Sequence, residues 1–424
     1  MPGIFTPATI VALHLSVLIT VSVIWSRIVP QPYMDEIFHI PQAQRYCQGD
    51  YWTWDPKLTT PPGLYVISNI LLAAQRPLCS TFFLRLTNLS YPFIILFTVA
   101  SLLKSIHPHL TRQERLNSAA VIICFPILWF FNFLYYTDGG SSAFILLSWL
   151  AAKKRHHLLS ALGSAVAVTF RQTNIIWSLF IVGTALLELS TPAERRRFDP
   201  KAAFVQSPLQ LIQALTGFIQ ILLSKFTRVI TISLPYLGLL AGFAAFVKWN
   251  GGIVLGDRSN HIPSMHVMQL FYFAVFSAGM SMFAILGVVP VARLIRRPTF
   301  KYGLLSFGSS LMSRYNGIIL YALVPAYIAA AWFCWQALGT EQTILWVVIY
   351  AVATMLTLIP SPLLEFRYFI TPYLIYRIAM RQPRGVWLFL ELLFYTAINA
   401  VTVWMFLNKP FRWAHQEGVQ RFMW

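Results

Sequence analysis

Long apolar stretches separated by short polar segments run along most of the chain. The first, residues 4–26, contains no Asp, Glu, Lys or Arg and ends just before Arg27. A helix of about 20 apolar residues is long enough to cross the hydrocarbon of a bilayer. No basic start or small-residue cleavage site of a removable signal precedes Arg27. The pattern therefore predicts an uncleaved first membrane-spanning helix.

Further apolar stretches predict more spans. They lie at residues 87–103, 118–136, 140–152, 158–188, 229–247, 267–292, 315–337, 342–362 and 386–408. At about 20 residues for each crossing, we expect roughly ten to twelve transmembrane helices and an all-α fold. Stretch 158–188 contains Arg171 and could form two short helices instead. Residues 62–78 could form a re-entrant or interfacial segment.

Composition excludes a soluble globular protein. Of the 424 residues, 57% are hydrophobic and only 11% are charged, whereas a soluble domain is typically about a quarter charged. We therefore expect residues 1–424 to form one polytopic unit embedded in the lipid bilayer. The net charge of +18 comes from short basic clusters between apolar runs, which is typical of cytosolic loops rather than of a nucleic-acid groove. No nucleic-acid partner is expected.

The basic clusters predict the orientation, because loops rich in Lys and Arg stay in the cytosol. They are Lys153–Arg155, Arg195–Arg197 with Lys201, and Arg293, Arg296, Arg297 and Lys301. We interpret 189–228 as a cytosolic basic loop whose apolar part, near 204–223, lies along the membrane surface or links two spans.

The loops that alternate with these clusters are predicted to share the opposite, lumenal side. They are the loop at residues 27–61 and the loop near 249–266. The wider segment 27–85 is interpreted as a lumenal loop with interfacial helices.

Cysteine spacing indicates neither a disulfide framework nor a metal site. The four cysteines are Cys47, Cys79, Cys124 and Cys334, and they show no paired spacing. The glycosylation triplet Asn88-Leu89-Ser90 adjoins an apolar stretch, so we expect it to lie too close to the bilayer for modification.

Acidic residues concentrate directly after the first span. Four of the 14 acids fall within residues 35–55: Asp35, Glu36, Asp50 and Asp55. If 35–47 is helical, Asp35 lies one turn from His39. A carboxylate in the lowered dielectric near a membrane surface favours its neutral form, so we expect a proton acceptor that works near neutral pH. The alternative is that one of the acids only caps the helix start.

A second polar loop could hold a phosphate. Its glycines allow close approach of the backbone, and its cationic side chains are Lys248, Arg258, His261 and His266. The alternative is a polar turn between spans. Two histidines five residues apart, without an obvious third ligand, are weak evidence for a metal.

Two polar segments also interrupt apolar sequence, Arg171–Asn174 and Glu365–Tyr368. A charge at membrane depth is costly, so Arg171 should face protein or a wet cavity. Glu365 and Arg367 could also form a purely structural ion pair. Asp138 lies in turn-like sequence and is expected to be mainly structural.

Together these segments resemble the family of dolichyl-phosphate-glucose-dependent alpha-1,2-glucosyltransferases. The similar segments are Tyr33–Gln44, Trp54–Pro56, Thr59–Tyr65, Arg171–Trp177, Gly256–His261 and Leu364–Ile370. They span almost the whole chain and occur in the family's order.

The resemblance implies a GT-C type fold in the endoplasmic reticulum membrane, with a multi-pass chain and a lumenal active site. The donor would be dolichyl phosphate glucose and the acceptor a diglucosylated nine-mannose oligosaccharide on dolichyl diphosphate. A β-linked donor and an α-linked product imply inversion in a single displacement. Asp35 is the first candidate for the base and Glu36 the second. The leaving phosphate would be stabilised by cations, with no metal and no cofactor.

The resemblance also supplies candidate substrate-binding residues. They are Tyr33, His39, Gln42, Trp54, Asp55, Arg171, Gln172, Asn174, Lys248, Asp257, Arg258, His261, His266, Glu365, Arg367 and Tyr368.

One departure concerns residues 303–316, where the family's polar lumenal run before the span at 315–337 is missing. Counting single spans after Lys301 places Glu365 in the cytosol, whereas the resemblance places it in the lumen. The alternatives are that 303–337 crosses twice or that this chain is a divergent or misassembled version. The competing functions are another dolichol-dependent glycosyltransferase and a multispanning transporter, although no internal repeat typical of transporters is visible.

Overall fold

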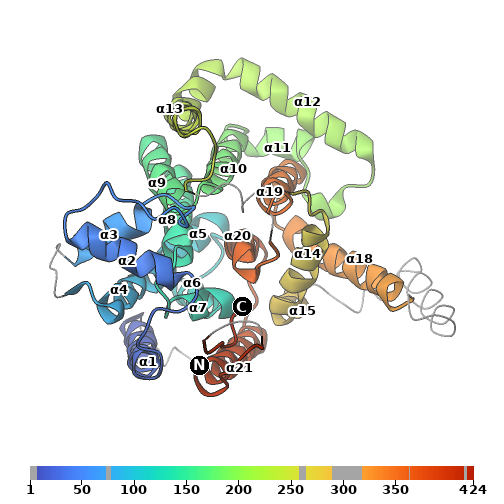
Figure 1. The fold of residues 1–424 in the computed structure, drawn as a ribbon. Coiled ribbons are helices and arrows are strands. Elements are labelled where there is room, and N and C mark those ends of the chain that lie inside the picture. The colour runs from blue at the N-terminus through green and yellow to red at the C-terminus, as the bar shows by residue number, and fades with distance from the viewer. Residues whose placement is uncertain (1–6, 73–77, 257–263, 289–317, 362, 415–417) are drawn as a thin grey trace.

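A computed structural model describes residues 7–72, 78–256, 264–288, 318–361, 363–414 and 418–424 (Figure 1). The helices are α1 (Pro7–Ile28), α2 (Glu36–Cys47), α3 (Gly63–Leu71), α4 (Thr81–Asn88), α5 (Ser90–Ile106), α6 (Arg112–Ile122), α7 (Pro126–Phe131), α8 (Asp138–Lys153), α9 (His157–Phe170), α10 (Asn174–Leu187), α11 (Pro192–Phe198), η2 (Ala202–Phe204), α12 (Pro208–Ser224), α13 (Phe226–Asn250), α14 (Met268–Met280), α15 (Met282–Val288), α18 (Ile318–Gly339), α19 (Ile344–Leu358), η3 (Phe366–Phe369), α20 (Ile370–Ala379) and α21 (Val386–Asn408).

The expected all-α membrane fold is confirmed. Four helical stretches in the described part of the chain are long and apolar enough to cross a bilayer, or up to six if two sharply bent helix pairs each count as one span. The described residues also contain four shorter apolar helical segments, which are α9, α12, residues Leu323–Gly339 of α18, and α19. The helices that meet the length criterion are therefore fewer than the ten to twelve predicted, because bends and short helices divide several of the apolar stretches.

Two of the predicted stretches are interrupted where the sequence disfavours a helix. Stretch 158–188 does form two helices, α9 and α10, with Arg171 between them. Stretch 118–136 was expected to be one span, and this is wrong. Pro126 lacks an amide hydrogen and begins a new helix, so the stretch divides into the end of α6 and the six-residue α7.

The centre of the bundle is the antiparallel pair of α8 and α9, with α5, α10 and α20 beside it (Figure 1). Small residues allow these helices to approach closely. A side-chain carbon at Gly140 would lie 2.2 Å from the Phe170 ring, and the hydroxyl groups of Ser148 and Ser164 are 2.6 Å apart. Close packing through small residues and interhelical hydrogen bonds is typical of membrane helix pairs.

Helix α8 has an acidic residue, Asp138, at one end and the first basic cluster, Lys153–Arg155, at the other. Asp138 begins the helix and Lys153 ends it, and 16 residues of α-helix span about 24 Å. At the Lys153 end, its ammonium forms an ion pair with Glu188 from the end of α10, next to the second basic cluster. The first two basic clusters therefore lie together at the end of the bundle opposite Asp138.

A second ion pair lies between α20 and α21, where the sequence analysis did not expect one. Arg377 and Glu391 are 2.6 Å apart and both are fully buried. Gln382 accepts a hydrogen bond from Arg377, and the Tyr395 hydroxyl donates to Glu391. Because a buried charge is tolerated only when it is paired and hydrogen-bonded, this network joins the two helices.

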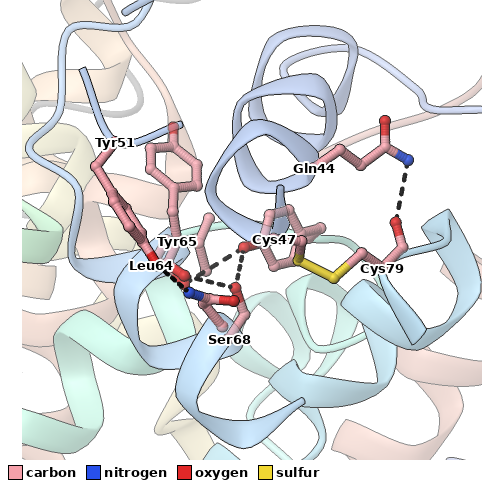
Figure 2. The surroundings of a disulfide bond; sticks show 9 residues. Gln44, Cys47, Tyr51, Leu64, Tyr65, Ser68 and Cys79 are labelled. Carbon is pink, nitrogen blue, oxygen red and sulfur yellow. Dashed lines mark hydrogen bonds between the residues drawn. A yellow bond between two sulfur atoms is a disulfide. The ribbon is translucent and has the colours of Figure 1, made fainter. Parts of the chain in front are cut away.

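Cysteine spacing did not indicate a disulfide, but the structure contains one. Cys47, the last residue of α2, is bonded to Cys79, just before α4 (Figure 2). The Gln44 side chain donates a hydrogen bond to the Cys79 carbonyl at 3.1 Å and supports the same junction. The sequence separation of 32 residues did not indicate this bond, because the pairing depends on how α2 and α4 lie against each other.

The disulfide predicts a specific labelling pattern. Cys124 and Cys334 have free thiols, so a denatured and unreduced sample should bind two maleimide groups, and a reduced sample four. Replacing Cys79 by Ser should lower the free energy of unfolding by about 3 kcal/mol, because a closed loop restricts the unfolded chain. Thermal unfolding in detergent measures this loss, with Cys334→Ser as the matched control. Four reactive thiols without reductant would contradict the pairing.

Asn88 does not have the geometry of a glycosylation site. Its side chain is buried, and its amide donates hydrogen bonds to the carbonyls of Leu134 and Tyr136 at 2.7 and 3.0 Å. The Asn88 side chain thus holds the segment before α8 against the junction between α4 and α5.

Candidate active site

Asp35 is the residue that directly precedes the first residue of α2. Its side chain makes no capping hydrogen bond, so helix capping does not account for it. Its backbone amide donates to the Tyr136 hydroxyl at 3.0 Å, and its side chain is 41% exposed. The preceding Met34 has φ of 53°, an uncommon value for a non-glycine residue. This turn leaves the Asp35 carboxylate accessible at the surface of the site.

Glu36 is placed in the opposite way. Its side chain is fully buried and paired with Arg85 of α4 at 2.6 Å. The two carboxylate oxygens also accept hydrogen bonds from the backbone amides of Tyr33 and Tyr135, at 3.0 and 2.7 Å. Glu36 therefore joins α2, α4 and the segment before α8, and its oxygens have no approach for a substrate.

Asp35 belongs to a cluster of alternating charges, which we call the acid–arginine cluster: Asp35, Asp138, Arg171, Glu365 and Arg367. Arg367 Nη1 lies 2.8 Å from Asp35 Oδ2, and Arg367 Nε donates to Glu365. Arg171 Nη2 lies 2.8 Å from Asp138 Oδ1. Four segments distant in sequence supply these five residues.

Aromatic rings connect the two arginines. The Arg171 guanidinium lies 5.5 Å from the centre of the Tyr368 ring. Arg367 lies 5.8 Å from the same ring and 5.5 Å from the Tyr136 ring. These cation–π contacts hold both guanidinium groups at one site, where three carboxylates and two cations alternate.

The cluster also decides on which side Glu365 lies. Arg367 is bonded to Asp35, so η3 and the residue before it share the side of the first loop, as the family resemblance requires and the single-span count did not. The alternative that residues 303–337 cross twice falls only partly on described residues. Residues 318–337 belong to α18, whereas 303–317 lie outside the described residues.

The Asp35 pKa differs from the sequence-based expectation. Burial alone would raise the pKa of this carboxyl, but the charge and hydrogen bond of Arg367, together with His39 and Arg171, outweigh burial and hold the pKa below its ordinary value. The expected rise is therefore wrong, because nearby cations dominate over the lowered dielectric. Asp35 is ionised at neutral pH and can accept a proton.

His39 follows one turn after Asp35 and is almost fully buried. Its Nδ1 lies 2.6 Å from the Tyr65 hydroxyl. Burial lowers the pKa of His39 to about 4, although Asp35 acts in the opposite direction. The imidazole is thus neutral at physiological pH. It packs beside the rings of Tyr65 and Tyr136 and helps to position them.

The lowered pKa of Asp35 and the lowered pKa of His39 predict the pH dependence of the reaction. Asp35 and His39 both lose their protons well below neutral pH, so neither should cause a fall in kcat/KM between about pH 8 and about pH 5.5. A pH profile of kcat/KM in buffers of constant ionic strength measures this. An acidic limb near pH ~6.5, the ordinary pKa of histidine, that vanishes in His39→Gln would contradict the prediction.

The two loops predicted to share one side do meet. The Leu255 amide donates to the Thr59 carbonyl at 3.2 Å, and the Gln172 side chain donates to the carbonyls of both Thr59 and Ile253. Gly256 has φ of 65°, and a side-chain carbon there would lie 2.2 Å from the Pro56 carbonyl. Gln172 thus fastens the second polar loop to the first.

The cations of the second polar loop are placed only in part. Lys248 is exposed near the end of α13, and His266 is exposed with its ring 2.6 Å from the Ser264 hydroxyl. Asp257, Arg258 and His261 lie outside the described residues. The phosphate-binding role of this loop stays a prediction.

Several other candidate residues hold the site together. Gln42 is buried, donates to the Thr53 carbonyl at 2.8 Å and accepts from the Asp55 amide at 3.1 Å. Trp54 Nε1 donates to the Leu58 carbonyl. These hydrogen bonds hold the loop after α2 in place. The side chains of Gln42 and Trp54 therefore have a structural role in the site.

Tyr33 and Asn174 have similar structural contacts. The Tyr33 hydroxyl donates to the Arg421 carbonyl at 3.0 Å and accepts from the Arg421 amide at 2.7 Å. The buried Asn174 amide donates to Ser141 and to the Ala167 carbonyl. A substrate contact for either residue stays a prediction.

Residues that sequence reasoning missed come mainly from the segment before α8. Tyr136 holds the Asp35 backbone, and Thr137 accepts a hydrogen bond from Arg171 Nε at 3.2 Å. Asp138, which we expected to be mainly structural, pairs with Arg171 in the cluster. The one available signal was the polar run from Tyr135 to Asp138 between apolar stretches.

Within the described residues, no group of three or more His, Cys, Asp or Glu side chains is arranged to hold a metal ion. Independence from a metal stays a prediction, because part of the second polar loop is not described.

Comparisons with known proteins agree with the sequence resemblance. The sequence pattern of the DIE2/ALG10 family matches residues 29–313 and 309–378, and the two matched blocks overlap at residues 309–313. A Mus musculus relative is 35% identical over 449 residues, with 94% of each chain covered. A Homo sapiens relative is 34% identical over 450 residues, also with 94% of each chain covered.

A more distant relative, from Arabidopsis thaliana, is 30% identical over 496 residues and covers 96% of this chain and 97% of its own. All three relatives are named Dol-P-Glc:Glc(2)Man(9)GlcNAc(2)-PP-Dol alpha-1,2-glucosyltransferase. Among solved structures, the archaeal oligosaccharyltransferase AglB from Archaeoglobus fulgidus, in complex with an inhibitory peptide and a dolichol-phosphate, is 11% identical with a TM-score of 0.33, and the match covers 92% of this chain and 55% of that one. By the extent of the sequence matches, the chain belongs to the DIE2/ALG10 family.

Proposed function

We infer that this protein is a dolichyl-phosphate-glucose alpha-1,2-glucosyltransferase. It transfers glucose from dolichyl phosphate glucose to the diglucosylated nine-mannose oligosaccharide on dolichyl diphosphate. The relatives named for this reaction align with nearly the whole chain. The observation that supports the chemistry is an ionised, accessible Asp35 beside two arginines at one end of a membrane-embedded helix bundle.

The reaction is a single displacement at the anomeric carbon of glucose. The acceptor hydroxyl oxygen attacks this carbon, the bond from the carbon to the phosphate oxygen breaks, and its electron pair leaves with dolichyl phosphate. The hydroxyl proton passes to Asp35. A β-linked donor thus yields an α-linked product, and Asp35 is the general base.

Arg367 has two partners in this proposal. Before substrate binds, it pairs with Asp35 and keeps the carboxylate ionised. The departing dolichyl phosphate gains one negative charge as the bond breaks, and a guanidinium stabilises such a charge through bidentate hydrogen bonds. Donation by Arg367 to the phosphate would release Asp35 for the acceptor hydroxyl. Arg171, held by Asp138 and Tyr368, supplies the second cation.

Glu36 serves the fold in this proposal and Asp35 the chemistry. Glu36 is enclosed by Arg85 and two backbone amides, whereas Asp35 is 41% exposed. Tyr368, Glu365 and Gln172 position the arginines and the adjoining loop. Lys248, Arg258, His261 and His266 remain proposed contacts to the diphosphate or phosphate groups of the two substrates.

We place this site on the lumenal side of the endoplasmic reticulum membrane. The disulfide between Cys47 and Cys79 lies in the same loop region as Asp35, and disulfides persist in oxidising compartments such as this lumen. The basic clusters at the opposite end of α8 are consistent with a cytosolic location there.

Reconstitution tests the function directly. Purified protein in liposomes receives dolichyl phosphate glucose and the diglucosylated acceptor lipid, and the product is analysed for mass and linkage. We expect one added hexose in α-1,2 linkage, and no elongation of an acceptor that lacks the two glucose residues. Uptake of free sugar into the liposomes without lipid elongation would instead indicate a transporter. Equal use of dolichyl phosphate mannose would identify a different dolichol-dependent transferase.

A further inference from the structure

A cavity of about 350 Å³ lies at the end of the bundle opposite the acid–arginine cluster. The turn between α8 and α9, the end of α10 and the first turns of α13 surround it. One part of its wall is apolar and includes Ala185, Leu189 and Ile232. The remainder carries Arg155, His157, Glu188 and Arg228, so the cavity is amphipathic.

The polar part of this cavity is cationic and is not neutralised by the protein. Glu188 is already paired with Lys153. Neither Arg155 nor Arg228 has an ion-pair partner among the described residues, and both are exposed. The nearby Lys225 is occupied by Glu194 and the Leu189 carbonyl. Two guanidinium groups thus remain available to an anion.

His157 adds a donor to the same wall. Its Nδ1 is buried and has no hydrogen-bond partner in the described part of the chain. The residue begins α9, where the helix dipole favours a negative charge. A buried polar atom without a partner is costly unless a ligand satisfies it.

The backbone at Arg155 has a left-handed conformation. Its φ is 64°, and its amide donates to the Ala152 carbonyl at 2.8 Å as the turn closes. Glycine is the usual residue for a left-handed position after a helix. Arg155 occupies such a position, and its side chain lines the cavity.

The location of the cavity indicates the source of the anion. Helix α13 is one of the helices that can cross a membrane, and only 6% of its most apolar stretch is buried in the protein. Most of α13 is therefore available to lipid, and Arg228 lies in its first turn. A cation at the start of such a helix lies at the depth of lipid headgroups.

We propose that this cavity binds the phosphate of an anionic phospholipid on the cytosolic side of the membrane. Arg155 and Arg228 pair with the phosphate, and His157 Nδ1 donates a hydrogen bond to the headgroup. Ala185, Leu189 and Ile232 contact the glycerol and the first acyl carbons.

The test measures binding of phosphatidylinositol with a fluorescent acyl chain to the purified full-length protein in phosphatidylcholine nanodiscs. The double variant Arg155→Gln/Arg228→Gln should bind about tenfold more weakly than wild type, because each basic residue near an anionic surface contributes to attraction. The matched control is Arg196→Gln/Arg197→Gln, which removes the same charge from α11 outside the cavity and should bind as wild type does. Thermal unfolding confirms that each variant is folded.

Thr231→Trp supplies a second variant, because it fills the cavity without removing a charge. It should also weaken binding. Equal binding by wild type, the double variant and Thr231→Trp would overturn the proposal. Competition by inorganic phosphate as effective as competition by the lipid would overturn the lipid assignment and indicate a site for a soluble phosphate. An equal loss in the α11 control would show that only the net charge matters, which also overturns a specific site.

Discussion

Asp35→Asn should reduce glucosyl transfer by about 10²- to 10⁴-fold, the range that a general base typically contributes. Asparagine keeps the size of the side chain but cannot accept the acceptor's hydroxyl proton. It also breaks the charge pair with Arg367, which lies 2.8 Å away in the wild-type protein. The initial rate of product formation in liposomes, at saturating donor and acceptor, is the measurement.

Asp50→Asn is the matched control for this experiment. Asp50 lies in the same segment between α1 and α3 and accepts hydrogen bonds from the amides of Trp52 and Thr53, but it is not in the acid–arginine cluster. Its variant should keep most of the activity. Undiminished turnover in Asp35→Asn would exclude Asp35 as the base, and an equal loss in both variants would indicate a defect of the loop instead.

Glu36→Ala should instead destabilise the protein, with an expected loss of about 3–5 kcal/mol in the free energy of unfolding. The substitution leaves Arg85 buried without its carboxylate and removes the acceptor for the amides of Tyr33 and Tyr135. Thermal unfolding in detergent and the folded yield measure the effect. The Glu36→Ala protein that does fold should have the same activity per folded molecule as wild type, whereas folded Asp35→Asn should have little activity.

Arg384→Ala is the control for the stability experiment, because it removes only the pair with Glu114, in which the Arg384 side chain is 56% exposed, and such exposed pairs contribute little. A Glu36→Ala protein that is as stable as wild type but inactive would contradict the division of roles between the two adjacent carboxylates.

Much of the fold was predictable from local sequence. Apolar length predicted a membrane protein, and Arg171 indicated where one stretch divides into α9 and α10. The break at Pro126 was missed although proline disfavours a helix interior, because the apolar run continues through it. The concentration of acids after the first span also led to Asp35 before any geometry was known.

Other features depend on contacts between distant segments. The pairing of Cys47 with Cys79 depends on how α2 and α4 lie against each other, and the Arg377–Glu391 pair depends on how α20 lies against α21. The direction of the Asp35 pKa shift also follows from Arg367, 332 residues further along the chain. Neither composition nor spacing contains this information.

The amino-acid sequence alone determined that this is an all-α membrane protein of a glucosyltransferase family, with a candidate base in its first loop. Hydrophobic length and short motifs are local properties, so they can be read along the chain. Only the tertiary structure distinguished the surroundings of Asp35 from those of Glu36, because adjacent carboxylates are alike in sequence and differ in what folds against them. Arg85 and two backbone amides enclose Glu36, whereas Arg367 faces Asp35 at an accessible surface, where its charge keeps that carboxylate ionised.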